Sequence, residues 1–288
     1  MALPRATSPG AVHLQVSDLG RSVDYYVQVL GLQVLARAGA EAVLGPHGPP
    51  ASLLHLQERA GASPVPRGGA LGLFHFAILV PSRADLGRFL AHLGEHRSSS
   101  GLTGLSDHLV SEAVYLSDPD GLGIEVYADR PRSTWRRDPS GQLEMATLPL
   151  DARSVIAAGA GTPWAGLPGG TTMGHVHLHV GDLGQARAFY GEALGLEPTV
   201  WEYPGALFLA AGGYHHHLGT NTWSRGGPAA DDQARLLAWD LVVPGEDAAR
   251  DAVARLGAAG HPAEHDNTGW RVADPWGTVV RIIAADGN

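Results

Sequence analysis

Two histidines and one glutamate have the residue types and the placement of a metal site. His75 and His175 each open a segment that reads as a strand, a helix and further strands, and Glu125 closes the segment that His75 opens. Two imidazoles and one carboxylate on one face of an ion are the ligand set of non-haem Fe(II) sites. We therefore predict that these three side chains hold a metal ion, with Fe(II) as the expected metal and Mn(II) as the alternative.

The same kind of segment occurs four times in the chain, twice with a histidine at its start and twice without. Ala11 and Ala238 open the other two copies, and the last copy has Arg281 where the second has Glu125. A guanidinium cation beside a metal ion is electrostatically unfavourable. The pattern predicts one complete ligand set, shared between the second and third segments.

An internal repeat supports this division, because residues 10–32 align with residues 174–196 without a gap. Alternating apolar residues predict a half-buried strand at the start of each copy, over residues 12–16 and 176–180. An aspartate follows two residues later in both copies, as at Asp18, where a helix N-cap belongs. Apolar residues at helical spacing come next. Each copy is predicted to begin with a strand and an amphipathic helix.

The four copies together predict an α+β fold of four βαβββ modules. Tight-turn sequences at residues 118–121 and 274–277 precede the last strand of the second and fourth copies. Modules one and two are expected within residues 8–128 and modules three and four within residues 174–286, with a linker rich in Pro, Gly, Arg and Ser over residues 129–173. A metal site between modules two and three requires these two modules to share one sheet.

Composition excludes several classes of function. A formal net charge of −9 with no basic run predicts no positively charged surface for binding nucleic acid or an anionic membrane. Without cysteine the chain has no disulfide, thiolate nucleophile or iron–sulfur ligand. Its first residues lack the apolar core of a signal peptide, and no apolar stretch approaches the roughly 20 residues of a membrane helix. We expect a cytoplasmic protein, and whether it forms a homo-oligomer is left open.

The module pattern resembles the vicinal oxygen chelate superfamily, which includes glyoxalases, bleomycin-resistance proteins and extradiol dioxygenases. Local sequences resemble its catechol 2,3-dioxygenase-like branch, and the resemblance covers nearly the whole chain. It implies two paired-module domains with cupped mixed sheets. The residues that carry the resemblance to the branch are 108–112, 115–121, 124–125, 129–132, 174–178 and 212–217.

The resemblance also implies ligand positions. In that superfamily the first-strand ligand lies five residues before the valine that ends the strand, which selects His75 and His175. The closing ligand lies six residues after the turn proline, which selects Glu125. Extradiol enzymes usually take all three ligands from modules three and four. A set from modules two and three departs from that arrangement.

Three further residues are implied as catalytic. His216, in the middle of the run 215–217, resembles the histidine that takes and returns a proton in extradiol enzymes. Tyr115 resembles the tyrosine that hydrogen-bonds the substrate or an oxygen intermediate, and His108 is a weaker candidate for the same surroundings. If the run 215–217 forms a strand, alternation places His216 on the face opposite its two neighbours.

The expected function is an Fe(II)-dependent extradiol ring-cleaving dioxygenase that acts on a catechol or hydroquinone-type aromatic with O2. One alternative is a glyoxalase-like isomerase or lyase, which would need a fourth protein ligand to its metal. Another is a protein that binds an aromatic compound without chemistry. His13, His55 and His177 are interpreted as structural. The tryptophans at positions 223, 239, 270 and 276 could line a pocket for an aromatic ring, and the default interpretation is packing between modules.

Overall fold

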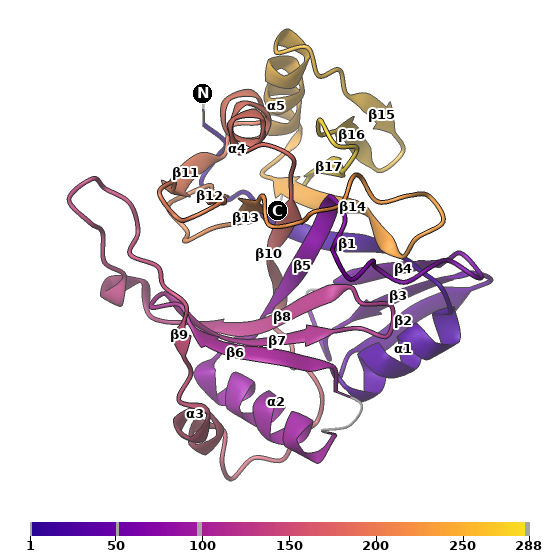
Figure 1. Cartoon of the computed structure of the whole chain (residues 1–288), viewed down its shortest axis with the longest axis vertical. Coiled ribbons are helices and arrows are strands. Elements are labelled where there is room, and N and C mark those ends of the chain that lie inside the picture. The colour runs from indigo at the N-terminus through magenta and orange to yellow at the C-terminus, as the bar shows by residue number, and fades with distance from the viewer. Residues whose placement is uncertain (1, 50–51, 97–99, 286–288) are drawn as a thin grey trace.

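Four βαβββ modules follow one another along the chain and form two curved mixed sheets (Figure 1). The computed structural model describes residues 2–49, 52–96 and 100–285. Modules one and two consist of β1 (Ser8–Val16), α1 (Leu19–Gln28), β2 (Gln33–Ala38), β3 (Glu41–Gly45), β4 (Leu54–Glu58), β5 (Gly72–Leu79), α2 (Arg83–Glu95), β6 (Leu102–Asp107), β7 (Ser111–Ser117) and β8 (Gly123–Asp129). Modules three and four consist of β10 (Thr172–His179), α4 (Leu183–Ala186) with its π-helical continuation η2 (Arg187–Ala193), β11 (Glu197–Val200), β12 (Ala206–Ala210), β13 (Leu218–Asn221), β14 (Arg235–Val243), α5 (Glu246–Ala258), β15 (Glu264–Asp266), β16 (Gly269–Ala273) and β17 (Val279–Ala284). The predicted α+β fold of βαβββ modules is confirmed.

Each sheet joins one module from residues 8–128 to one module from residues 174–286. The eight-stranded sheet has the order β15-β16-β17-β14-β1-β4-β3-β2, so it contains modules four and one. The nine-stranded sheet has the order β11-β12-β13-β10-β5-β8-β7-β6-β9, so it contains modules three and two. Modules two and three therefore share one sheet, as a metal site between them requires. Residue 286, the expected end of module four, lies outside the described residues.

The middle of the nine-stranded sheet is where β10, β5 and β8 lie side by side. In the antiparallel pair of β10 and β5, His177 lies opposite His75, and His175 lies opposite Ala77. In the parallel pair of β5 and β8, Ala77 lies opposite Glu125. All of these side chains lie on one face, because alternate residues of a strand and their cross-strand partners point the same way. The small side chain of Ala77 leaves room for the longer side chains around it to converge.

The strand-to-helix connection of modules one and three follows the repeat. The side chain of Asp18 caps α1 by accepting from the backbone N–H of Arg21 at 2.9 Å. The side chain of Asp182 caps α4 by accepting from the backbone N–H of Gln185 at 2.8 Å. A capping aspartate satisfies one of the free N–H groups in the first helical turn. The predicted N-cap positions are confirmed.

Part of the segment 129–173 packs against module two. It contains the 3-10 turn η1 (Arg132–Thr134), the short strand β9 (Leu148–Pro149) and the helix α3 (Ala152–Ala158). β9 pairs with β6 at the edge of the nine-stranded sheet. α3 lies against α2 (Figure 1), and Arg83 of α2 donates to the carbonyl oxygen of Ser154 at 3.1 Å. This segment thus adds an edge strand to the sheet that carries the predicted ligands, and its helix covers α2.

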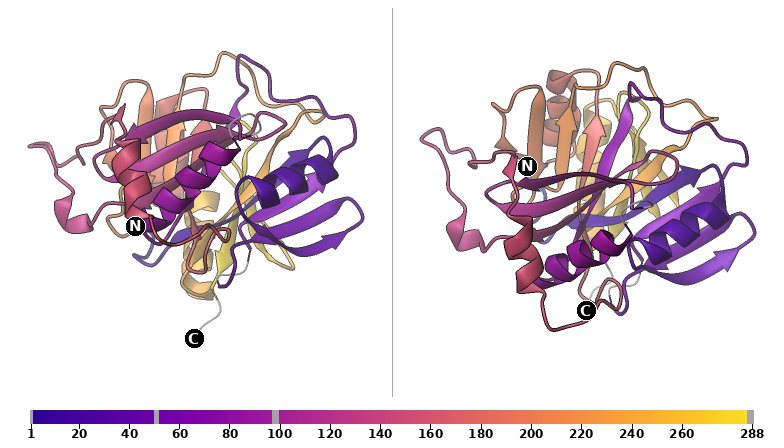
Figure 2. Two further views of the ribbon diagram at one scale, coloured as in Figure 1. Left: turned by 90° about the horizontal axis from the view of Figure 1, so that it is seen from below. Right: turned by 60° about the horizontal axis from the view of Figure 1, so that its bottom comes forward.

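Figure 2 shows α2 across the strands of module two and α1 across the strands of module one. Both helices bury their apolar side chains against these strands, including Tyr26 of α1 and Phe89 of α2, which are fully buried. The opposite, concave face of the nine-stranded sheet is left for the ligand side chains. No helix in the described part of the chain combines the length and the apolar character that crossing a membrane requires.

We expect Gly87→Ala to lower the free energy of unfolding by about 1–3 kcal/mol, as overpacking typically does. A Cβ atom at Gly87 would lie 2.1 Å from the carbonyl oxygen of Val155, so α2 and α3 would have to move apart. Gly94→Ala in the same helix is the matched control, because nothing lies within 4 Å of its Cβ position. There, the better helix propensity of alanine should raise stability by up to about 1 kcal/mol. Urea unfolding followed by circular dichroism measures both, and equal stabilities would contradict the packing of α3 on α2.

Candidate functional site

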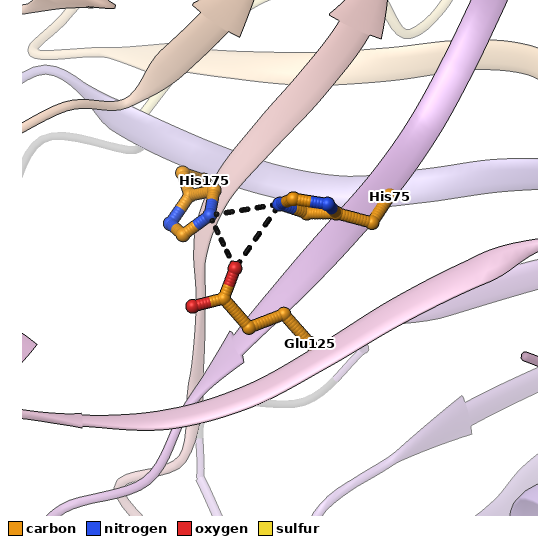
Figure 3. A group of neighbouring side chains, drawn as sticks. All are labelled: His75, Glu125 and His175. Carbon is orange, nitrogen blue, oxygen red and sulfur yellow. Dashed lines mark hydrogen bonds and ion pairs between the residues drawn. The ribbon is translucent and has the colours of Figure 1, made fainter. Parts of the chain in front are cut away.

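The three predicted ligands converge from three neighbouring strands (Figure 3). His75 comes from β5, Glu125 from β8 and His175 from β10, and all three side chains are buried. The two Nε2 atoms lie 3.3 Å apart. The Oε2 atom of Glu125 lies 3.0 Å from Nε2 of His75 and 3.1 Å from Nε2 of His175. The structure therefore brings together the complete set that the sequence predicts.

The triangle of donor atoms has the size of a metal-binding face. Two atoms that each lie about 2.1 Å from one ion, at right angles, are roughly 3.0 Å apart. The three observed separations of 3.0, 3.1 and 3.3 Å are close to that value. Two imidazole nitrogens and one carboxylate oxygen on one face leave the other positions of an octahedral ion free. The residues fit a divalent transition metal, and together they form a buried metal-binding triad of two histidines and one glutamate.

Electrostatics favour the protonation states that bind a cation. Burial alone would raise the pKa of Glu125, but the imidazoles of His175 and His75 outweigh it and hold this pKa well below its usual range. Burial lowers the pKa of His175 to about 4, against the opposing charge of Glu125. The glutamate is thus an anion and His175 is neutral at pH 7. A metal ion requires these states of its ligands.

Tyr115 and His108 form a hydrogen-bonded pair beside the triad. The Nδ1–H of His108 donates to the carbonyl oxygen of Ala146 at 2.7 Å, so Nε2 is free to accept from the hydroxyl of Tyr115 at 2.7 Å. Tyr115 lies opposite Glu125 in the β7–β8 ladder, and its ring centroid is 5.5 Å from that of His75. Burial and the charge of Glu125 raise the pKa of Tyr115 well above its usual value. Its hydroxyl therefore stays protonated at neutral pH.

His216 lies next to His175, but the run 215–217 does not form the strand that alternation requires. β12 ends at Ala210 and β13 begins at Leu218, and Gly212 and Gly213 turn the chain with φ values of +63° and +71°. In this connection the rings of neighbouring histidines do not alternate between faces. The ring centroids of His216 and His215 lie 4.1 and 6.1 Å from that of His175. The run therefore lacks the strand on which the expected alternation depends.

A hydrogen-bond chain that sequence reasoning missed leads to His216. Nε2 of His215 lies 3.0 Å from Oδ1 of Asp129, and the Nδ1 atoms of His215 and His216 are 2.8 Å apart. Asp129 is the last residue of β8, four residues after Glu125. Burial, with the nearby imidazoles of His175 and His215, lowers the pKa of His216 well below its usual value, so this side chain is neutral. Nothing in the sequence indicates this series of hydrogen bonds, because it depends on how a loop folds over the end of a strand.

A cavity of about 750 Å³ opens over the triad. It is lined by all six predicted site residues, which are His75, His108, Tyr115, Glu125, His175 and His216. Phe74, Tyr203, Phe208 and Trp223 add an aromatic wall. Such a cavity, mostly apolar with a few convergent polar groups, is typical of a site for a small organic ligand.

Two residues whose default interpretation from the sequence was structural line the cavity. His177, interpreted as structural, is buried and hydrogen-bonded to Asn221, yet it also lines the cavity. Its position two residues after His175 on one strand was the available signal, since i and i+2 share a face. Trp223, interpreted as packing, also lines the cavity. The packing interpretation holds for the other tryptophans, which belong to the core or lie against it, at positions 239, 270 and 276.

The eight-stranded sheet has a different cluster where the ligand positions have been lost. Arg281 donates to Asp240 at 3.1 Å, and Nε2 of His13 lies 3.0 Å from the same carboxylate oxygen. His55 packs on His13, with ring centroids 4.5 Å apart. The ligand position of the fourth module is Ala238, which is buried. Over residues 2–49, 52–96 and 100–285, the buried triad is the one group of three metal-ligating side chains close enough to share an ion.

Known proteins are similar to this chain in sequence and in fold. A relative from Bacillus subtilis (strain 168), named Catechol-2,3-dioxygenase, is 44% identical over 273 residues, which cover 93% of this chain and 94% of that protein. A solved structure from Bacillus subtilis subsp. subtilis str. 168, provisionally described as a dioxygenase, has a TM-score of 0.68 at 12% identity and covers 100% of this chain and 87% of that one. Glyoxalase I from Zea mays has a TM-score of 0.58 at 17% identity and covers 96% and 93%. At these identities the two structures show the fold alone.

A family model assigns the chain directly. The model described as the Glyoxalase/Bleomycin resistance protein/Dioxygenase superfamily matches residues 8–126 and 172–282, which is most of the sequence. The resemblance to the vicinal oxygen chelate superfamily, and to its catechol 2,3-dioxygenase-like branch, is confirmed. The chain belongs to the glyoxalase, bleomycin resistance protein and dioxygenase superfamily.

Proposed function

We propose that this protein is an Fe(II)-dependent extradiol dioxygenase that opens the ring of a catechol or hydroquinone-type aromatic with O2. The observation that carries the proposal is the buried triad of His75, Glu125 and His175 at the base of an aromatic-lined cavity. The relative named Catechol-2,3-dioxygenase, similar over nearly the whole chain, supports the same activity. A small aromatic and O2 are the expected partners, and a cytoplasmic location and a homo-oligomer stay predictions.

Fe(II) held by His75, Glu125 and His175 would supply electron transfer between an aromatic and O2. The protein holds both reactants next to each other, so that a reaction between two free molecules becomes one within a single complex. Phe74, Phe208 and Trp223 provide apolar surface for the ring. Glu125 provides a buried negative charge that offsets part of the charge of the ion.

His216 is the expected acid–base group. With His215 neutral, its Nε2–H donates to Asp129, so its Nδ1 accepts from the Nδ1–H of His216. The Nε2 atom of His216 then has a free lone pair, and the side chain lines the cavity. Such an imidazole can take a proton from a substrate hydroxyl and return it when the ring opens. Asp129 and His215 act through His216, as positioning residues.

Tyr115 is expected to contact the ligand through its hydroxyl oxygen. Its O–H donates to Nε2 of His108, and the Nδ1–H of His108 is held in turn by the carbonyl oxygen of Ala146. This arrangement leaves the lone pairs of the tyrosine oxygen available to accept from a ligand hydroxyl. His108 orients Tyr115 in this proposal.

The glyoxalase-like alternative has less support from the site. It needs a fourth protein ligand, and the residues that the structure describes supply three. His216 is the nearest further imidazole, and its Nδ1 already faces His215. Binding of an aromatic without chemistry uses the same cavity, so only an activity measurement separates that alternative from the proposal.

The deciding experiment starts from protein stripped of metal with a chelator and reloaded anaerobically with Fe(II). Catechol, 4-methylcatechol and hydroquinone are then added with O2, while an oxygen electrode and visible absorbance follow uptake and the yellow ring-opened product. We expect one O2 consumed per ring opened, and no turnover by protein loaded with Zn(II). No oxygen uptake with any of these aromatics would overturn the proposal, and turnover of a hemithioacetal under strict anaerobiosis would favour the glyoxalase alternative.

A further inference from the structure

We infer that Asn221 is a positioning residue that fixes the proton of His177 on Nδ1, so that this imidazole donates a hydrogen bond to an oxygen of the bound ligand. The inference rests on the proposed function only for the nature of that ligand, a catechol with an oxygen beside the metal. The hydrogen-bond geometry that supports it belongs to the protein alone.

The orientation of the Asn221 amide follows from its contact with the main chain. The backbone N–H of Trp223 points at one amide atom of Asn221 at 3.0 Å. A backbone N–H can only donate, so the atom that faces it is the oxygen Oδ1. The other atom, Nδ2, lies 3.0 Å from Nε2 of His177. The two ends of the amide are therefore distinguished without reference to either histidine.

The tautomer of His177 follows from this orientation. Nδ2 of Asn221 can only donate, so Nε2 of His177 must offer a lone pair. A ring with a lone pair on Nε2 is neutral and has its one proton on Nδ1. The same amide also orients His179, whose Nδ1 lies 2.6 Å from Oδ1 and therefore donates to it. One buried asparagine thus fixes the same tautomer in two histidines of β10.

The Nδ1–H of His177 is the group that remains for a ligand. Among the described residues it has no hydrogen-bond partner, and the side chain lines the cavity. The ring lies flat on Gly219, where a Cβ atom would be 2.9 Å from it, so the ring cannot turn easily. His177 is also the cross-strand neighbour of His75, with ring centroids 5.0 Å apart. A donor in this place faces the ligand beside the metal triad, where an ionised oxygen would accept a charge-assisted hydrogen bond.

The matching residue of module one shows that the fold does not require this arrangement. His13 occupies the repeat position of His177, at the same distance along the aligned segments 10–32 and 174–196. Its Nε2 lies 3.0 Å from the carboxylate of Asp240, with the guanidinium of Arg281 beside it. The asparagine and its pair of histidines are therefore particular to the sheet that holds the ligand cavity.

The tautomer can be measured directly, without substrate. Protein labelled with ¹⁵N and loaded with Zn(II), which is diamagnetic, gives long-range ¹⁵N–¹H correlations that distinguish Nδ1–H from Nε2–H imidazoles. We expect His177 and His179 to be protonated on Nδ1 in the wild type, and Asn221→Leu to shift His177 toward the Nε2–H form. A wild-type His177 protonated on Nε2, or a tautomer unchanged in Asn221→Leu, would overturn the inference.

Ligand affinity tests the donated hydrogen bond. His177→Phe keeps a ring against Gly219 and removes the Nδ1–H, so the Kd for catechol under anaerobic conditions should rise by about tenfold or more. His13→Phe, at the repeat position in the other sheet, is the matched control and should leave the Kd unchanged. An unchanged Kd in His177→Phe would contradict the contact with the ligand. A wild-type protein that binds catechol but opens no ring would contradict the proposed function. The tautomer result would be unaffected.

Discussion

His175→Ala should remove stoichiometric metal from the protein. The substitution takes away one of two imidazoles and leaves the buried carboxylate of Glu125 with His75 alone. We expect affinity for Fe(II) to fall by at least about 100-fold, because losing even an outer partner of a ligand costs about 10- to 100-fold. Anaerobic equilibrium dialysis against Fe(II), followed by elemental analysis, gives the number of ions per chain.

The control for this experiment is His265→Ala. His265 is exposed and packs edge-on against Trp270, far from the triad in the order of strands. It should retain one ion per chain. If His175→Ala is too unstable to purify, Glu125→Gln keeps the shape of the side chain, removes its charge and should lose the metal in the same way. One bound ion per chain in either triad variant would refute the shared site of modules two and three.

His216→Gln should lower kcat by about 100-fold or more while the iron content stays at one ion per chain, since general acid–base groups contribute about 10²- to 10⁴-fold. Glutamine retains hydrogen bonding and loses the ability to take up a proton at neutral pH. Steady-state oxygen uptake with catechol, normalised to bound iron, measures the effect. A kcat equal to that of the wild type would exclude His216 as the acid–base group.

His217→Gln is the matched control in the same connection. His217 stacks on Tyr214 and accepts from the backbone N–H of Ala211, and it does not line the cavity. Its substitution should leave kcat per iron within about twofold, as expected of a residue outside the ligand cavity. Loss of iron from His216→Gln would have a different meaning. It would identify His216 as a fourth ligand and favour the glyoxalase-like alternative.

The metal triad could be predicted because it depends on strands and on duplication. His75, His175 and Glu125 stand out when each module is compared with a copy that has lost the ligand, such as the copy with Arg281. The repeat also sets the register, since a strand that begins at the same residue in each module presents the same face. Pairing of modules two and three then followed from the requirement that the three ligands share one ion.

The surroundings of the triad could not be predicted in the same way. Strand alternation does not apply to the run 215–217, because two glycines in left-handed conformation precede it and the run forms a connection. His215 and His216 therefore both approach His175. Asp129 and Asn221 orient histidines only because the fold brings them into contact, Asp129 with His215 and Asn221 with His177. Periodicity reports which face a strand residue occupies. It does not report which loop closes over that face.

Pairing of the first module with the last also sets an order of events on the ribosome. β1 takes one of its two neighbours from β14, so that side of the strand has no partner until residues 235–243 have been made. The sheet with the triad needs only residues up to 221. The metal-binding half can therefore close first, while one edge of the N-terminal module stays open for most of synthesis. An open edge is where strands pair wrongly with other chains, so translation is the stage at which this architecture is most exposed to aggregation.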